Sequence, residues 1–298
     1  MLVLQITIFG TMLVGLIVRK LGIVGVEARK DLTNLVINIV LPCNIITSFI
    51  TRLSTDLLRE CVTIFLVSVG VQAFSVIYGK VLYRKESPSR SMNLRYGIIC
   101  SNAGFLGNPI AEGLYGATGL MLASIYLIPQ RIMMWSEGIA IYSGISDKKE
   151  TAKKVISHPC VLACIVGLIL LLTQADIPEV ILTPIQTIGH CNTALSMMVI
   201  GMILAEISIK EIVDKAVILY SLQRLVIIPL IIYVVLTIIP VSHLVRGLSV
   251  ILAAMPAGAT TSMLASKYDR DPVFATKLVV FSTLCSIPAI IIWSAVLI

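Results

Sequence analysis

The sequence reads Cys-Ser-Asn-Ala-Gly-Phe-Leu-Gly-Asn-Pro at residues 100–109 and Ala-Ala-Met-Pro-Ala-Gly-Ala-Thr-Thr-Ser at residues 253–262. Both stretches set a proline among glycine, alanine and small polar residues, and both lie inside long apolar segments. A proline removes one backbone donor and clashes with the preceding helical turn. In a membrane, the carbonyls that it frees must find partners or line a water-filled cavity. We therefore predict that two membrane helices are interrupted here.

The composition supports a membrane protein. The 298 residues are 57% hydrophobic and 13% charged, with a mean hydropathy of +0.99, whereas soluble domains are about half apolar and about a quarter charged. The basic residues lack the aromatic and glycine interleaving of a nucleic-acid surface. The sequence shows no phosphate-binding loop, nucleophile elbow or metal-ligand spacing. We expect no enzyme activity, cofactor, metal site or nucleic-acid partner.

Ten apolar segments are long enough to cross a hydrocarbon core of ~30 Å. They lie at residues 2–19, 32–51, 60–80, 94–115, 119–143, 159–174, 182–205, 212–239, 244–266 and 273–297. Of the 23 Lys and Arg residues, 18 lie in the connections on one side or within five residues of the segment ends that border them, three lie in such positions on the other side, and two lie deep inside segments. Connections rich in Lys and Arg stay cytoplasmic. The expectation is a multi-pass protein of the plasma or inner membrane with both termini extracytoplasmic.

Ten helices divide into five plus five, and an odd number makes the second half enter the membrane in the opposite sense. The predicted fold class is an all-α polytopic membrane protein built from two inverted five-helix repeats. Residues 1–146 form the first repeat, residues 147–157 the cytoplasmic linker and residues 158–298 the second repeat. The two proline stretches then occupy matching fourth and ninth helices. A single break is often an ordinary kink, but paired breaks favour a midplane anion site, because half-helix N-termini point positive dipole ends at the ligand.

Two arginines lie inside predicted spans, Arg131 in the fifth and Arg224 in the eighth. An arginine at a helix centre costs ~2.5–3.5 kcal/mol on insertion scales and is kept only with a partner or a role. Glu112 and Glu137 are the expected acidic partners. An arginine here could bind a substrate carboxylate, and a glutamate could carry a coupling proton. The alternative is a buried ion pair that only holds helices together.

The residues around these breaks resemble the auxin efflux carrier family, whose prokaryotic members include malonate and malate permeases, within the wider group related to bile acid sodium symporters. The resemblance rests on Ser-Asn-Ala-Gly-Phe-Leu-Gly-Asn-Pro at 101–109, Ala-Met-Pro-Ala at 254–257, Leu-Ala-Ser-Lys-Tyr at 264–268 and Phe-Ser-Thr-Leu at 281–284. The second apolar segment, around Leu41 and Pro42, is also similar to the second helix of that family.

The resemblance implies that the broken fourth and ninth helices cross at the midplane, that a transport core moves against a scaffold in an elevator-like manner, and that the protein forms a homodimer. It places the substrate at the crossing. The candidate substrate-binding residues, from the breaks and the resemblance together, are Asn44, Asn102, Gly104, Asn108, Pro109, Arg131, Met255, Pro256, Thr260 and Thr261.

The predicted function is a secondary transporter, a permease or efflux carrier, that moves a small mono- or dicarboxylate across a lipid bilayer by alternating access. Coupling to H⁺ or Na⁺ is left open, with Glu112, Glu137 and Arg224 as the candidates for coupling or ion pairing. One alternative is a sodium- or proton-coupled antiporter of similar fold. Another is a membrane sensor that binds the same anion and signals through a partner.

Overall fold

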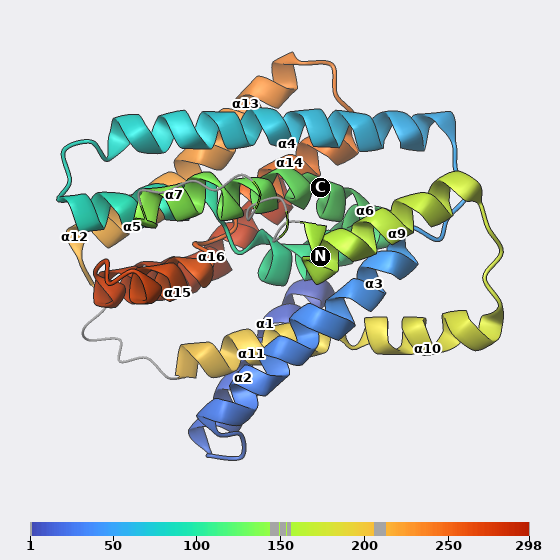
Figure 1. Ribbon diagram of the computed structural model, residues 1–298, viewed down its shortest axis with the longest axis horizontal. Coiled ribbons are helices and arrows are strands. Elements are labelled where there is room, and N and C mark those ends of the chain that lie inside the picture. Colours follow the sequence, from blue (N-terminus) through green and yellow to red (C-terminus); the bar gives the residue numbers. More distant parts are fainter. Residues whose placement is uncertain (1, 144–148, 150–152, 154–155, 206–212, 298) are drawn as a thin grey trace. The chain divides into compact units, whose positions relative to one another are not determined.

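The computed structural model describes residues 2–143, 149, 153, 156–205 and 213–297, and in these residues all regular elements are helices (Figure 1). The predicted all-α class is confirmed. The predicted linker at residues 147–157 and the boundary at residue 146 fall largely outside the described residues.

The helices follow the apolar segments along the chain. The α-helices are α1 (Leu2–Lys20), α2 (Val26–Leu35), α3 (Leu41–Ser48), α4 (Thr55–Leu82), α5 (Pro88–Ile99), α6 (Asn108–Trp135), α7 (Glu137–Ser143), α9 (Pro159–Thr173), α10 (Glu179–His190), α11 (Asn192–Ala205), α12 (Lys215–Leu222), α13 (Ile228–Ile238), α14 (His243–Ala253), α15 (Thr260–Lys267) and α16 (Pro272–Leu297). Three π-helical turns join some of them: η1 (Val36–Val40), η2 (Ala103–Gly107) and η4 (Gln223–Ile227).

Several of these helices are membrane spans by length and composition. Six helical stretches meet both requirements: Val26–Ser48, Thr55–Leu82, Ala103–Met134, Glu179–Ala205, Lys215–Ile238 and Pro272–Leu297. The apolar helices α9 and α14 are shorter. The protein is therefore a multi-pass membrane protein, while the count of ten spans and their inverted symmetry stay predictions.

Each π-helical turn precedes a proline. The turns η1, η2 and η4 end two residues before Pro42, Pro109 and Pro229, respectively. A proline lacks the amide proton and its ring displaces the carbonyl four residues earlier, so the preceding turn widens. The widened turn does not interrupt the helix from α2 through η1 to α3, which Figure 1 shows as one continuous helical ribbon. The sequence analysis recognised the first two prolines but not Pro229.

The chain forms two compact units. The first unit comprises Met1–Cys61, Phe105–Ile125 and Ile156–Ile207, and the second unit comprises Val62–Gly104, Tyr126–Val155 and Ser208–Ile298. Both units draw on both predicted repeats. The division into residues 1–146 and 158–298 stays a prediction, because packing into units does not report internal symmetry.

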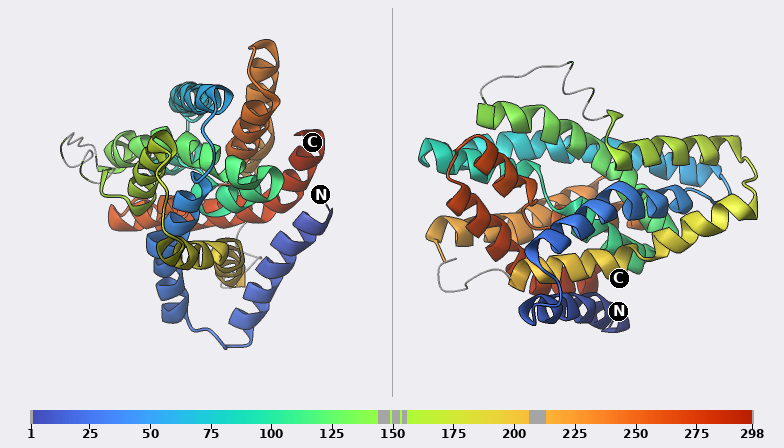
Figure 2. Two further views of the ribbon diagram at one scale, coloured as in Figure 1. Left: turned by 90° about the vertical axis from the view of Figure 1, so that its right-hand side faces the viewer. Right: turned by 60° about the horizontal axis from the view of Figure 1, so that its bottom comes forward.

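In the first unit, α1 packs along α11 and α3 packs against α9 and α10. The chain reverses between α1 and α2 through a short turn (Figure 2). A Cβ atom on Gly201 would lie 1.8 Å from the Met12 carbonyl oxygen, and one on Gly15 would lie 2.0 Å from that of Met198. The backbones of α1 and α11 thus approach so closely that only glycine fits, as is common between membrane helices.

In the second unit, α16 is the central helix and packs against α5, α12, α14 and α15. The aromatic rings of Tyr96 and Tyr142 form a buried cluster with Cys100 and Leu264. These contacts join α5, α7 and α15 next to the second predicted break and the start of the first, residues 100–104; residues 105–109 belong to the first unit.

Candidate functional site

The two predicted breaks are real, and they are hydrogen-bonded to each other. The α5 helix ends at Ile99 and α14 ends at Ala253, and neither continues directly into the next helix. The backbone N–H of Asn102 donates to the Pro256 carbonyl at 2.8 Å, and the N–H of Gly258 donates to the Cys100 carbonyl at 3.0 Å. We call residues 100–102 and 254–258 the crossing.

The middle of the crossing resembles a very short piece of antiparallel sheet, because Ser101 and Ala257 form a bridge. Gly258 suits this close approach, since a Cβ atom at this position would lie 3.0 Å from the Cys100 carbonyl oxygen and would need a shift of a few tenths of an ångström. Backbone groups that lose their helical partners thereby pair across the two breaks, which is how irregular backbone is tolerated at membrane depth.

Polar side chains satisfy further backbone groups of the crossing. Gln130 on α6 donates from Nε2 to the Ser101 carbonyl at 2.7 Å, and the Ser101 hydroxyl donates back to Gln130 Oε1 at 3.2 Å. Ser282 on α16 accepts the N–H of Ala257 at 3.1 Å. Side chains of α6 and α16 thus hold the first and the second break, respectively.

Arg224 binds carbonyls of both broken helices. It is 3% exposed, and it donates from Nε to the Met255 carbonyl at 3.0 Å and from Nη1 to the Ile98 carbonyl at 2.9 Å. No carboxylate pairs with it in the part of the chain that the structure describes. The predicted ion-pair role therefore needs correction: this arginine replaces helical donors that the two breaks lack.

The backbone carbonyl that Pro229 leaves without a helical donor, near Arg224, also has a hydrogen-bond partner. Pro229 cannot donate to the carbonyl of Leu225, four residues earlier, and Trp293 on α16 donates to this carbonyl from Nε1 at 2.8 Å. Gln223, which precedes Arg224, accepts a hydrogen bond from the Tyr78 hydroxyl. The turn around Arg224 is thus fixed on both sides by side chains.

Arg131 has no such partners. Its side chain is 6% exposed, and within the described ranges its Nη1 atom makes no hydrogen bond. A Cβ atom on Gly104 would lie 3.6 Å from Nη2, so the guanidinium group lies against the backbone of η2. The predicted pair with Glu137 is not formed, because Glu137 binds Lys80 at 3.1 Å and lies 3.9 Å from Arg95.

The α15 helix starts directly after the crossing with Thr260 and Thr261. Thr261 is fully buried, and its hydroxyl has no partner among residues that the structure describes. The Tyr142 hydroxyl donates to the Thr261 carbonyl at 3.4 Å and to Asn93 Oδ1 at 2.7 Å. The first turn of α15 therefore places a buried hydroxyl next to the crossing, while its Thr261 and Met263 N–H groups donate to the Gly258 and Ala259 carbonyls at 2.9 and 3.3 Å.

The first unit contains the remaining predicted residues. Asn44 on α3 is 3% exposed and donates from Nδ2 to Glu112 Oε2 at 2.9 Å. Asn108 and Pro109 begin α6. Asn108 is fully buried, and neither atom of its amide group has a partner in the described chain.

The structure thus sorts the predicted residues into two groups. The second unit brings together Asn102, Gly104, Arg131, Arg224, Met255, Pro256, Thr260 and Thr261, and the first unit contains Asn44, Asn108, Pro109 and Glu112. Glu137 lies in the second unit in the ion pairs given above. Ser282 and the role of Gln130 were missed in the sequence, although Gln130 precedes Arg131 and Gln223 precedes Arg224 inside apolar segments.

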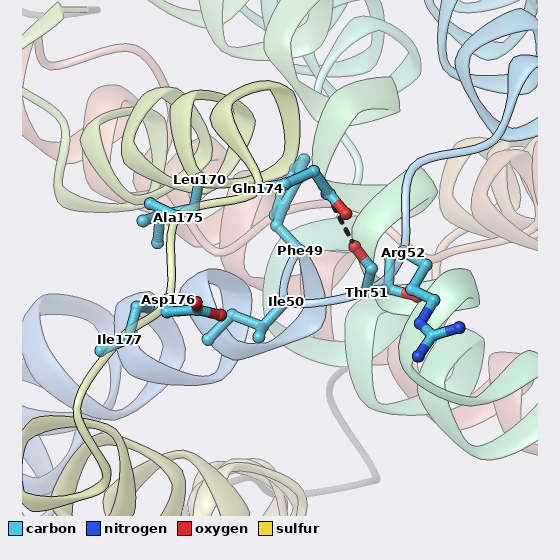
Figure 3. A pocket seen from close by; sticks show the side chains of 9 residues that line it. All are labelled: Phe49, Ile50, Thr51, Arg52, Leu170, Gln174, Ala175, Asp176 and Ile177. Carbon is cyan, nitrogen blue, oxygen red and sulfur yellow. Dashed lines mark hydrogen bonds between the residues drawn. The ribbon is translucent and has the colours of Figure 1, made fainter.

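A pocket of about 250 Å³ lies elsewhere in the first unit, at the ends of α3 and α9 (Figure 3). Gln174 closes one wall by donating to the Thr51 carbonyl at 3.1 Å. The charged residues Arg52 and Asp176 are exposed and lie on opposite sides of the pocket. With one charge of each sign and little enclosure, this pocket has neither the net positive charge nor the burial that an anion site needs.

The likeness to known proteins extends over nearly the whole chain. A family model described as membrane transport protein matches residues 1–294. An uncharacterized transporter of Methanothermobacter thermautotrophicus is 27% identical over 292 residues, which are 96% of this chain and 94% of that protein. An uncharacterized transporter of Methanocaldococcus jannaschii is 24% identical over 294 residues, 96% of this chain and 95% of that protein. The likeness therefore concerns the full set of helices and not one motif.

Proposed function

We propose that this chain, which belongs to the membrane transport protein family of the auxin efflux carriers, is a secondary transporter for a small organic anion. The resemblance seen in the two proline stretches is confirmed at the level of the family. Membership and the transporter relatives support transport as the activity. The substrate class rests on the residues of the second unit.

The observation that supports an anion is the guanidinium group of Arg131, whose buried Nη1 atom has no hydrogen-bond partner among the described residues. A buried charge without a counter-ion is costly in a membrane protein, and it is usually paired or functional. Arg131 and Arg224 place two positive charges in the second unit without a carboxylate partner in the residues described. A bound anion would offset this charge, whereas a cation would increase the repulsion.

A carboxylate suits the donors that remain free near the crossing. Arg131 can bind the two oxygens of a carboxylate in a bidentate pair. The N-terminus of α15 provides the positive end of a helix dipole and the buried Thr261 hydroxyl. The side chain of Asn102, between the crossing and η2, adds an amide donor. We propose a mono- or dicarboxylate as substrate, which these groups bind without chemical change.

The residue types of the crossing favour an anion carrier over the antiporter alternative. Cation and proton antiporters need acidic side chains at the ligand, and residues 98–104 and 253–261 contain no Asp or Glu. The anion carrier therefore remains the better interpretation of this site.

The proposed mechanism is alternating access of the elevator type, in a ten-helix inverted repeat with both termini on the extracytoplasmic side of the cell membrane. Two features support it. The crossing lies entirely within one compact unit, which could carry a substrate as a body. Both breaks are held by a side chain of a later helix, Gln130 of α6 for the first and Ser282 of α16 for the second, which agrees with two related repeats.

The test is uptake of radiolabelled malonate, malate and indole acetate into proteoliposomes by wild type and by Asn102→Ala. We expect uptake of one of these acids by wild type and its loss in Asn102→Ala. Asn38→Ala is the matched control, because Asn38 lies in the π-helical turn η1 and donates only to the Asn34 carbonyl; it should transport normally.

Two outcomes would contradict the proposal. Full uptake by Asn102→Ala would remove the crossing from the mechanism. Binding of an acid without uptake of any of the three would favour the sensor instead.

A further inference from the structure

The first unit contains one carboxylate inside a predicted span whose partner is neutral. Glu112 lies on α6 and accepts a hydrogen bond from the Asn44 amide of α3 at 2.9 Å. It is partly buried, and no Lys or Arg pairs with it in the described residues. The titratable group that acts on its charge through space is His190, at the end of α10.

An asparagine partner suits a carboxyl group that changes its protonation state. The amide N–H₂ donates to the carboxylate, and the amide oxygen can accept from the protonated acid after a rotation of the side chain. A cationic partner would instead hold the carboxylate in its charged form. Glu137 shows that second arrangement, because its carboxylate contacts Lys80 and Arg95.

A second observation, the unpaired amide group of Asn108, indicates a polar ligand beside this carboxyl group. Asn108 lies four residues before Glu112, so both side chains project from the same face of α6, one turn apart. Its amide is fully buried, and neither its oxygen nor its nitrogen has a partner in the described part of the chain. Buried amides are normally hydrogen-bonded, so this one calls for a polar ligand that both donates and accepts, such as water or an acid.

The close packing of α10 on α3 fixes the geometry of this site. A Cβ atom on Gly189 would lie 3.0 Å from the backbone nitrogen and from the Cα atom of Asn44. Asn44 therefore has little freedom to leave Glu112, and exchange of the hydrogen bond requires only a side-chain rotation.

We infer that Glu112, with Asn44 as its partner, carries the proton that is transported together with the organic anion. This inference rests on the proposed function. The Glu112 carboxylate takes up one proton from the side where the anion binds. It stays a neutral carboxylic acid while the anion passes through the membrane, and it releases the same proton on the other side. The energy comes from the proton gradient across the membrane.

The contacts favour a proton over a sodium ion. The Asn44 N–H₂ group already points at Glu112 Oε2, an arrangement that presents a donor and not an oxygen ligand. Sodium and similar cations need several oxygen ligands. Among the residues described, no group of three or more acidic, His or Cys side chains could hold a metal ion.

The experiment compares Glu112→Gln with wild type in proteoliposomes, using malonate, malate and indole acetate as probes. The first assay is exchange of labelled external acid for the same unlabelled acid inside, without a gradient. The second is accumulation driven by an imposed pH gradient. We expect Glu112→Gln to keep exchange and to lose accumulation, because a permanently neutral side chain lets the anion-loaded protein cross but can neither take up nor release a proton.

The matched control is Glu137→Gln, which removes a carboxylate that is paired with cations; it should keep both activities. A pH-sensitive dye inside wild-type proteoliposomes provides a measurement without any variant: uptake of the acid should acidify the interior.

Accumulation by Glu112→Gln equal to that of wild type would overturn the inference. So would wild-type uptake that follows a sodium gradient alone, or uptake that leaves the internal pH unchanged. Absence of both exchange and accumulation in wild type is a different result, since it would overturn the proposed function itself and the inference with it.

Discussion

Two buried arginines of the second unit differ in what their guanidinium groups bind. Both follow a glutamine inside an apolar segment, and both are almost inaccessible, at 6% exposure for Arg131 and 3% for Arg224. Arg224 donates to the Ile98 and Met255 carbonyls, whereas Arg131 Nη1 has no partner in the described chain. The same residue type in the same local sequence therefore serves two purposes.

This difference teaches that a charge inside a membrane helix is not by itself evidence of a binding site. Breaking two helices frees carbonyls, and a guanidinium group with five donors can replace the missing N–H groups. We therefore expect Arg224 to stabilise the crossing and Arg131 to bind the proposed anion. Substitutions at both positions should separate stability from transport.

The largest effect is expected for Arg224→Met. This substitution leaves two buried carbonyls without donors, at about 1–3 kcal/mol each, so the free energy of unfolding should fall by about 3 kcal/mol. The thermal melting temperature of the purified protein in detergent measures this. Arg52→Met, which changes an exposed arginine in the other unit, is the control and should melt like wild type. A normal melting temperature for Arg224→Met would mean that the crossing does not depend on these two hydrogen bonds.

For Arg131→Met we expect a smaller effect, on the affinity for the transported acid and not on stability. Since Nη1 has no protein partner to lose, the melting temperature should stay near that of wild type or rise. Affinity for the transported acid should fall by about tenfold to a hundredfold, which corresponds to loss of a charge-assisted hydrogen bond of about 1.5–3 kcal/mol. Calorimetric titration in detergent measures the dissociation constant.

Arg131→Lys sharpens this second prediction. It keeps the charge but loses the bidentate geometry, so its affinity should lie between those of wild type and Arg131→Met. Unchanged affinity in Arg131→Met would show that Arg131 is structural after all, and the contrast between the two arginines would disappear.

Much of the fold could be predicted from the sequence, for physical reasons. Lipid demands long apolar segments, and proline removes a backbone donor wherever it stands. These two rules located the apolar helices and both breaks at residues 100–109 and 253–262. The third π-helical turn was missed because Pro229 stands in the apolar sequence Ile-Ile-Pro-Leu-Ile at residues 227–231, which lacks the glycine and small polar residues of the two predicted breaks.

The partners of the charged residues could not be predicted. Arg224 and Ile98 are 126 residues apart in the chain, and nothing local indicates that a carbonyl, and not Glu112 or Glu137, would satisfy this arginine. Pairing of Glu137 with Lys80 likewise depends on how α7 packs against α4. Residue types indicated where polar groups are needed, but tertiary packing decided which of them remain free for a ligand.

The smallest effect is expected at the glutamines that precede the two arginines. Gln130 exchanges two hydrogen bonds with Ser101 in the crossing, whereas Gln223 accepts one from Tyr78 outside it. Gln130→Leu should cost about 1–2 kcal/mol of stability, because the buried Ser101 carbonyl loses its donor. It should also lower the rate of uptake, since the break that positions Asn102 loosens. Gln223→Leu, the matched control, should lose a similar amount of stability. Its rate of uptake per folded molecule should equal that of wild type. Equal transport per folded molecule in both variants would mean that the crossing needs no support from α6, and that the backbone pairing of Asn102 with Pro256 and of Gly258 with Cys100 is sufficient to hold it.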